Sequence, residues 1–168
     1  MDDLKKIYLD TAEHLKVDSY LDFLRHLVRV TEPKQIVEFG AYKGLSAAMM
    51  MDFLPEDGHL YSVDARDTSW TLLKDHFQLT KVVGDDNDIN TWKDVQVDLG
   101  KTDLWYIDSW HDDEHVFKTL EVYTPYFKKG ALLVFDDIIT IPKVWETLPY
   151  DKIDISPHHY PGFGIAKV

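Results

Sequence analysis

Short apolar runs alternate with longer polar and amphipathic segments from residue 35 onward. Apolar strands that are separated by helices indicate a parallel sheet buried on both faces. The expected strands are 36–40, 60–64, 81–85, 104–108 and 131–137, and the expected helices between them are 44–54, 68–79, 87–99 and 112–128. The pattern therefore predicts an α/β fold, a Rossmann-like three-layer sandwich with helices on both faces of a mostly parallel sheet.

The two ends of the chain extend this pattern. Apolar residues at positions 21, 24, 27 and 28 share one helical face, with Asp18 or Ser19 as the expected N-cap and Pro33 as the end of the helix. A short helix near 143–148 precedes an antiparallel hairpin of 152–156 and 163–168 at the sheet edge. We therefore expect one domain over residues 1–168, with N-terminal helices in 1–32 and a ligand-binding core in 35–168.

Composition excludes several classes of partner. The chain has 168 residues, with 18 basic and 30 acidic side chains and a formal net charge of −12. An acidic chain without a basic stripe repels nucleic acid, so no nucleic-acid partner is expected. There is no cysteine, which excludes disulfides and zinc–thiolate sites. A charged N-terminus and the lack of any apolar run of about 20 residues predict a soluble, cytoplasmic protein without a membrane partner.

The segment IVEFGAYKGLS, residues 36–46, is the most informative motif. An apolar strand ends at Glu38, and Gly40 and Gly44 follow before a helix, so a ligand can approach the backbone closely. The spacing E-x-G-x-x-x-G differs from the G-x-G-x-x-G of nicotinamide sites and favours S-adenosylmethionine. An ordinary strand-to-helix turn is the alternative at this point.

Acidic residues stand at the ends of five successive expected strands: Glu38, Asp64, Asp85, Asp108 and the pair Asp136–Asp137. The carboxyl ends of such strands line one crevice, which would favour a cationic ligand. Glu38 and Asp108 would offset a sulfonium charge, and Asp64 can accept both hydroxyls of a ribose. Asp85, Asp86 and Asn87 could meet an adenine edge, although DDND is also an ordinary turn and N-cap sequence.

Asp108, Asp136 and Asp137 form a second constellation. Three neighbouring carboxylates repel one another unless a cation joins them, and oxygen ligands favour Mg²⁺. The alternative is that Asp137 caps the next segment and Asp136 only lines the pocket. His111, three residues after Asp108, is well placed as a general base.

The remaining histidines are expected to have other roles. Those at positions 14, 26, 59, 76 and 115 are expected at the surface, and His158 and His159 near the mouth of the site.

Taken together, the chain resembles class I S-adenosylmethionine-dependent methyltransferases. It is most similar to catechol O-methyltransferase and related metal-dependent small-molecule O-methyltransferases. The likeness runs from about residue 36 to 138 and is carried by VEFGAYKGLSA, VVGDDNDI, DLWYIDSWHDDEHV and KKGALLVFDDI.

The resemblance implies a seven-stranded sheet with a terminal antiparallel hairpin. It also implies roles for particular residues. Glu38, Gly40, Tyr42 and Ser46 would surround the methionine part of the cofactor, Asp64 would bind the ribose, Asp86 and Asn87 the adenine, Trp110 would flank the adenine, and Asp108, Asp136 and Asp137 would hold the metal.

Three positions depart from the catechol enzymes. His111 stands where the catechol enzymes carry lysine, whereas related sugar and macrolide O-methyltransferases have histidine in a similar D-x-x-H. Asp137 stands where the catechol enzymes have asparagine. The terminal hairpin carries Gly162 and Gly164 with no acid nearby. These differences argue against a catechol acceptor.

The leading hypothesis is Mg²⁺-assisted methyl transfer from S-adenosylmethionine to a hydroxyl of a small molecule, with His111 and Asp108 as catalytic residues. The alternatives are a cofactor-binding module or regulatory subunit without catalysis, and a nicotinamide-dependent oxidoreductase. Aromatic residues at the expected mouth, including Trp110, Trp145 and Tyr160, would equally suit an acceptor site or the surface of a homodimer.

Overall fold

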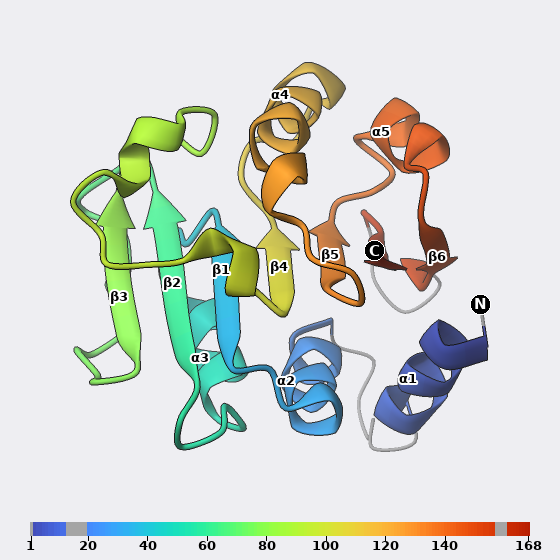
Figure 1. The fold of residues 1–168 in the computed structure, drawn as a ribbon, viewed down its shortest axis with the longest axis horizontal. Coiled ribbons are helices and arrows are strands. Elements are labelled where there is room, and N and C mark those ends of the chain that lie inside the picture. The colour runs from blue at the N-terminus through green and yellow to red at the C-terminus, as the bar shows by residue number, and fades with distance from the viewer. Residues whose placement is uncertain (1, 13–19, 157–160) are drawn as a thin grey trace.

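The computed structural model describes residues 2–12, 20–156 and 161–168. Within these residues, seven strands form one sheet in the order β3-β2-β1-β4-β5-β7-β6 (Figure 1). The strands are β1 (Gln35–Phe39), β2 (His59–Asp64), β3 (Leu79–Val83), β4 (Leu104–Ile107), β5 (Leu132–Asp136), β6 (Asp151–Asp154) and β7 (Phe163–Lys167). Strands β1 to β5 run parallel, whereas β7 is antiparallel to both β5 and β6. The predicted fold, including the terminal hairpin, is confirmed.

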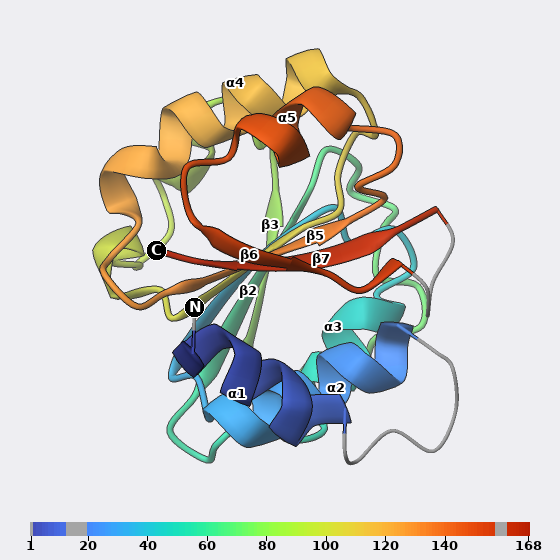
Figure 2. The ribbon, with the colours of Figure 1, turned by 90° about the vertical axis from the view of Figure 1, so that its right-hand side faces the viewer.

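Helices cover both faces of the sheet, as Figure 2 shows in an edge-on view. The helices α1 (Asp2–Ala12), α2 (Tyr20–Thr31) and α3 (Leu45–Met51) lie on one face, and α4 (Asp113–Tyr123) and α5 (Pro142–Thr147) on the other. Three short 3-10 helices are η1 (Ile89–Trp92), η2 (Leu99–Lys101) and η3 (Thr124–Tyr126). No helix of the described residues is long and apolar enough to cross a membrane.

Successive side chains along the central strands alternate between two hydrophobic clusters, one on each face of the sheet. Ile36 and Leu104 pack with α1, α2 and α3, whereas their neighbours Val37 and Trp105 pack with α4. Successive side chains of a strand point to opposite faces, so residues two apart share a face. Glu38 therefore lies on the side of α2 and α3, near the carboxyl end of β1.

The helix expected over 68–79 is wrong. This segment is irregular, and Trp70 adopts a left-handed backbone conformation with φ 63°. Two of its amides pair with the glycine loop: Trp70 N donates to Tyr42 O at 2.7 Å, and Leu72 N to Lys43 O at 3.0 Å. These hydrogen bonds to the glycine loop outweigh the preference of the local sequence for a helix.

The helix expected over 87–99 is also wrong, because only η1 and the start of η2 fall there. Asp88 Oδ1 accepts a hydrogen bond from Asn90 N at 2.9 Å, and Asp98 Oδ1 accepts one from Gly100 N at 3.2 Å. Short acidic side chains compete in this way for backbone groups, which favours turns over a continuous helix.

The other expected helices are present with shifted ends. α4 stops at Tyr123, because Pro125 begins the separate turn η3. The first of the N-terminal helices expected in 1–32 corresponds to α1, which is described to Ala12. The predicted caps Asp18 and Ser19 lie outside the described residues, as do His14, His158, His159 and Tyr160.

Candidate active site

The order of the strands reverses between β1 and β4, and the predicted acids meet there. Gly40 follows β1 with φ 89°, and a Cβ at this position would lie 2.0 Å from the carbonyl oxygen of Asp108. Asp108 N in turn donates to Phe39 O at 2.9 Å. Only glycine allows this contact, so the two strand ends that build the crevice are locked together at Gly40.

The glycine loop turns directly into α3. Gly44, at the N-cap of α3, has φ 84°, and Tyr42 also has a positive φ of 45°. The Tyr42 side chain is 69% exposed. The loop thus presents backbone and an accessible aromatic ring at the mouth of the crevice, as the predicted role in cofactor binding requires.

Glu38 is fully buried and accepts hydrogen bonds from the hydroxyls of Ser46 and Ser62. Ser62 Oγ accepts a further bond from the indole nitrogen of Trp70 at 2.8 Å. Burial raises the pKa of Glu38 to about 7, although the two serine hydroxyls act against this shift. Glu38 therefore sits at the floor of the loop, where a positive charge would favour its ionised form.

Asp64, at the end of β2, holds the glycine loop. Its Oδ2 accepts hydrogen bonds from Ala41 N at 3.1 Å and Tyr42 N at 2.8 Å, and its Oδ1 accepts one from Arg66 N at 2.9 Å. A carboxylate has about four acceptor positions, so one remains in this arrangement. Binding both hydroxyls of a ribose, as predicted, requires Asp64 to release one of these backbone amides.

The DDND segment after β3 combines two roles. Asp85 and Asp88 act as turn and cap residues, since Asp85 Oδ1 accepts a hydrogen bond from Asn87 N at 2.8 Å and Asp88 caps η1. Asp86 and Asn87 instead bind α4. Asp86 contacts His115 Nε2 at 3.0 Å and accepts from Ser109 Oγ at 2.6 Å, and Asn87 Nδ2 lies 3.0 Å from His115 Nδ1.

His115 is therefore not the surface residue that the sequence predicts. Its side chain is 22% exposed and joins the DDND segment to α4. Asp112 Oδ1 accepts a hydrogen bond from the amide of His115 at 2.9 Å as the N-cap of α4, so this part of the helix is fixed at its first turn.

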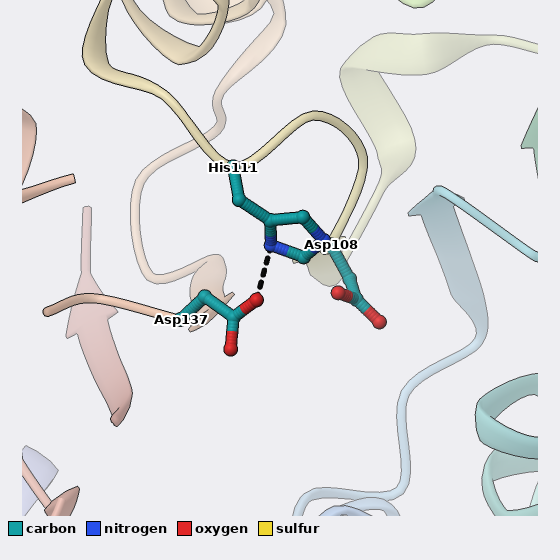
Figure 3. Close-up of side chains that lie close together, drawn as sticks. All are labelled: Asp108, His111 and Asp137. Carbon is teal, nitrogen blue, oxygen red and sulfur yellow. Dashed lines mark ion pairs between the residues drawn. The ribbon is translucent and has the colours of Figure 1, made fainter. Parts of the chain in front are cut away.

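The acids of the second constellation meet His111. One ligand atom each of Asp108, His111 and Asp137 lies within 4.8 Å of the other two (Figure 3). Nδ1 of His111 contacts Oδ2 of Asp137, which leaves the second ring nitrogen for another partner. The His111 side chain is 47% exposed, compared with 16% for Asp137, so the cluster opens to solvent on the histidine side.

Asp136, a predicted metal ligand, is not among the three residues whose ligand atoms meet, but it lies next to Asp108. The hydroxyl of Tyr106 lies 3.1 Å from Asp108 Oδ2 and 3.3 Å from Asp136 Oδ2, which links the two carboxylates. Burial and the charges of Asp136 and Glu38 raise the pKa of Asp108 well above its usual range. Carboxylates that shift one another in this way are stabilised by a cation.

Asp137 does not cap α5, whose N-cap is Ile141. It has φ 54°, and its carbonyl oxygen accepts hydrogen bonds from Thr140 N and Thr140 Oγ1, both at 2.8 Å. Such left-handed conformations outside glycine are uncommon and occur often at functional sites. The turn directs the side chain of Asp137 toward His111 rather than toward α5.

Two residues that sequence reasoning missed contribute to this end of the crevice. Tyr106 is on the same face of β4 as Asp108, a relation that alternation could have revealed. Tyr20 begins α2, and burial together with the charges of Asp136, Asp108 and Asp137 raises its pKa to about 12. No local sequence signal connects Tyr20 with acids more than eighty residues away.

The aromatic residues differ in position. Trp110 is 65% exposed, and its role at the adenine stays a prediction. Trp145 packs edge to face on Phe135, with ring centroids 5.9 Å apart, and belongs to the core. Ser46, the remaining predicted cofactor contact, is buried against Glu38.

The donor set at Asp108, Asp136, Asp137 and His111 fits a divalent cation. Carboxylate oxygens suit Mg²⁺ and Mn²⁺, and an imidazole nitrogen is accepted more readily by Mn²⁺ and other transition metals. The opening toward solvent leaves room for waters or substrate oxygens. These residues could therefore hold such an ion, with His111 at its margin.

Comparison with protein families identifies the family to which the chain belongs. Residues 37–138, more than half of the chain, match the family described as a methyltransferase domain. The chain belongs to this methyltransferase family. No curated protein sequence matches it significantly.

Solved structures share the fold of this methyltransferase at low sequence identity. The O-methyltransferase from Bacillus cereus in complex with SAH is 16% identical, with a TM-score of 0.70 and coverage of 100% of this chain and 91% of that one. The O-methyltransferase TomG from Streptomyces achromogenes, involved in tomaymycin synthesis and solved with SAM, is 20% identical, with a TM-score of 0.68 and coverage of 98% and 88%. The SAH-bound methyltransferase PaMTH1 from Podospora anserina is 14% identical, with a TM-score of 0.66 and coverage of 99% and 88%.

The resemblance to class I S-adenosylmethionine-dependent methyltransferases is thus confirmed in family and in fold. Family and fold do not identify the atom that receives the methyl group or a metal requirement. Both questions depend on the site itself.

Proposed function

We propose that this methyltransferase transfers a methyl group to a hydroxyl oxygen of a small molecule, with a divalent cation at Asp108, Asp136 and Asp137. The single observation that carries the proposal is the cluster of Asp108, His111 and Asp137, whose ligand atoms lie within 4.8 Å of one another. Asp136 is outside this cluster and is linked to Asp108 through the hydroxyl of Tyr106. An acidic crevice beside a histidine suits a hydroxyl that must be bound, oriented and deprotonated.

The cofactor side of the crevice supports S-adenosylmethionine as methyl donor. Bound there, the cofactor supplies an electrophilic methyl group on a sulfonium. The glycine loop offers backbone and the ring of Tyr42, and the buried Glu38 would offset the sulfonium charge. Several solved structures with the same fold contain SAM or SAH according to their descriptions.

The chemistry at the acceptor side requires a proton transfer and an in-line substitution. A cation at the carboxylates would lower the pKa of a coordinated hydroxyl. His111 would take the hydroxyl proton, the oxygen would form a bond to the methyl carbon, and the carbon–sulfur bond would break to leave a neutral thioether. Holding the two reactants in line accounts for much of the acceleration expected.

The contact of His111 Nδ1 with Asp137 supports the role of His111 as base. A carboxylate on one ring nitrogen orients the imidazole and leaves the other nitrogen to accept the proton. Asp137 would then serve both the histidine and the cation. A catechol acceptor is disfavoured, because residues 161–168, around Gly162 and Gly164, contain no acid.

Removal of the metal tests the proposal. Wild-type protein is treated with EDTA and screened against a panel of hydroxylated small molecules, with and without added Mg²⁺ or Mn²⁺. We expect transfer to oxygen that disappears with EDTA and returns with the ion. Undiminished transfer in EDTA would overturn the metal part of the proposal.

The role of His111 is tested separately. His111→Ala should lower turnover by about 10²- to 10⁴-fold, while the affinities for S-adenosylhomocysteine and Mn²⁺ remain unchanged. A large loss of Mn²⁺ affinity would make His111 a metal ligand instead of the base. Binding of S-adenosylhomocysteine without transfer to any acceptor would favour a non-catalytic cofactor-binding module.

A further inference from the structure

The hydroxyl of Tyr106 lies between two of the acids that are proposed to hold the cation. Its oxygen is 3.1 Å from Oδ2 of Asp108 and 3.3 Å from Oδ2 of Asp136. The Tyr106 side chain is completely buried. It therefore approaches the carboxylates from inside the protein, opposite to the solvent side from which a substrate would enter.

Strand register explains this position. Tyr106 of β4 pairs with Val134 of β5 in the parallel ladder. Asp108 and Asp136 each come two residues later on the same face, so the tyrosine hydroxyl is directed along the sheet toward both. The ring packs near Phe163, with centroids 6.3 Å apart, and β7 pairs Phe163 with Asp136. Three strands thus fix one ring beneath the two acids.

Packing alone does not require the hydroxyl. A phenylalanine would fill the same apolar volume between β4 and β7. A buried hydroxyl without partners destabilises the folded state, so a tyrosine here depends on the carboxylates it contacts. Groups that hydrogen-bond to metal ligands commonly orient them, and their loss lowers metal affinity by about 10- to 100-fold.

We propose that Tyr106 is a positioning residue of the cation site, whose hydroxyl holds the carboxylates of Asp108 and Asp136 in the orientation that binds a divalent ion. This inference rests on the proposed function, because it presupposes that these acids bind a cation. Tyr106 touches neither substrate nor cofactor in this role. Its effect is on the affinity for the ion rather than on the chemical step.

The test compares Tyr106→Phe with Tyr123→Phe. Tyr123 is also a buried tyrosine, but it lies in the core on the opposite face of the sheet, where Trp92 Nε1 donates to its hydroxyl at 2.9 Å. Mn²⁺ affinity is measured by calorimetry and by the electron paramagnetic resonance signal of free Mn²⁺. Thermal unfolding without metal and affinity for S-adenosylhomocysteine are measured in parallel.

We expect Tyr106→Phe to weaken Mn²⁺ binding by about 10- to 100-fold, with unchanged affinity for S-adenosylhomocysteine. Turnover at saturating Mn²⁺ should approach that of the wild type, because the chemical groups are intact. Tyr123→Phe should lower thermal stability without changing Mn²⁺ affinity. Equal Mn²⁺ affinity in wild type and Tyr106→Phe, or an equal loss in both variants, would overturn the inference.

Failure of the proposed function gives a different result. If wild-type protein binds neither Mg²⁺ nor Mn²⁺, the metal part of the proposed function is wrong, and the role of Tyr106 is overturned with it. If wild-type protein binds Mn²⁺ and loses activity in EDTA while Tyr106→Phe binds equally well, the proposed function stands and only the inference about Tyr106 fails.

Discussion

The acids in the two halves of the crevice differ in their hydrogen-bond partners. On the side of β1, β2 and β3, protein donors satisfy each acid: two serine hydroxyls for Glu38, three backbone amides for Asp64, and Ser109, Thr119 and His115 for Asp86. On the side of β4 and β5, Asp108 and Asp136 share the hydroxyl of Tyr106, and Asp137 contacts His111. Burial together with the neighbouring charges raises the pKa of Asp108. The first group holds loops together through hydrogen bonds, whereas the second brings acids close together, and it is this group that we propose to hold a cation.

Gly40 joins these two halves, and its substitution should have the largest effect. In Gly40→Ala the new Cβ would lie 2.0 Å from the backbone oxygen of Asp108, so β1 and β4 must separate at the site. We expect a loss of about 4 kcal/mol or more in the free energy of unfolding, measured by urea denaturation.

Gly130→Ala is the matched control for Gly40→Ala. Gly130 also has a positive φ, of 87°, but a Cβ added there would meet no other atom of the described residues within 4 Å. It should lose only the conformational cost of about 1 kcal/mol. Equal losses in the two variants would show that close contact at Gly40 is unimportant.

The carboxyl group of Glu38 makes the free energy of unfolding depend on pH. Burial raises the pKa of Glu38 from 4.5 to about 7. Between these two values the native state keeps a proton that the unfolded state has lost, so the free energy of unfolding falls as the pH rises and levels off above pH 7. The total effect is about 3 kcal/mol.

Glu38→Gln should remove this dependence. The difference in unfolding free energy between the variant and wild type should grow in favour of the variant from pH 5 to 7 and then stay constant, as measured by urea denaturation at several pH values. Other titrating groups cancel in the difference. A difference that does not change with pH contradicts the buried, protonated state of Glu38.

Neutralising one acid in each half should have effects of opposite sign on metal-free protein. Asp64→Asn weakens three hydrogen bonds to backbone amides and should destabilise by about 2 kcal/mol. Asp108→Asn relieves repulsion and should stabilise by about 1 kcal/mol, with loss of Mn²⁺ binding. Thermal unfolding and Mn²⁺ titration of both variants provide the check, and destabilisation by Asp108→Asn would remove the contrast between the halves.

His115 should have a modest effect, on ligand affinity. His115→Ala frees Asp86 and Asn87 from α4, so we expect about 10-fold weaker binding of S-adenosylhomocysteine, or about 1.4 kcal/mol. His59→Ala is the control, since His59 contacts Thr80 Oγ1 at 2.8 Å at the opposite end of β2. Calorimetric titration measures both, and unchanged affinity in His115→Ala would mean that this network does not organise the adenine segment.

The strands and the acids at their ends could be predicted from sequence because both signals are local. An apolar run followed by Glu38, Asp64 or Asp108 indicates a buried strand and a polar residue at its carboxyl end. The parallel sheet then brings these ends together at one edge. The same reasoning failed for 68–79, where the amides of Trp70 and Leu72 bind the glycine loop, a partner that is distant in sequence.

The partners of each acid were also beyond sequence reasoning. Nothing near Asp86 indicates that His115, on a helix after the next strand, contacts it. His111 and Asp137 are 26 positions apart and meet because β4 and β5 are neighbours and the turn at Asp137, with φ 54°, directs its side chain back. Spacing along the chain identified the residue types but not their pairing.

The sequence by itself determined the α/β architecture, the glycine loop and the acidic character of the crevice, because periodicity, glycine spacing and charge are written in local order. Only the tertiary structure decided which donors each acid binds and that Asp108, His111 and Asp137 lie close together. Hydrogen bonding and repulsion between carboxylates depend on separations of a few ångströms, and packing of strands and helices sets those separations across residues that are far apart in the chain.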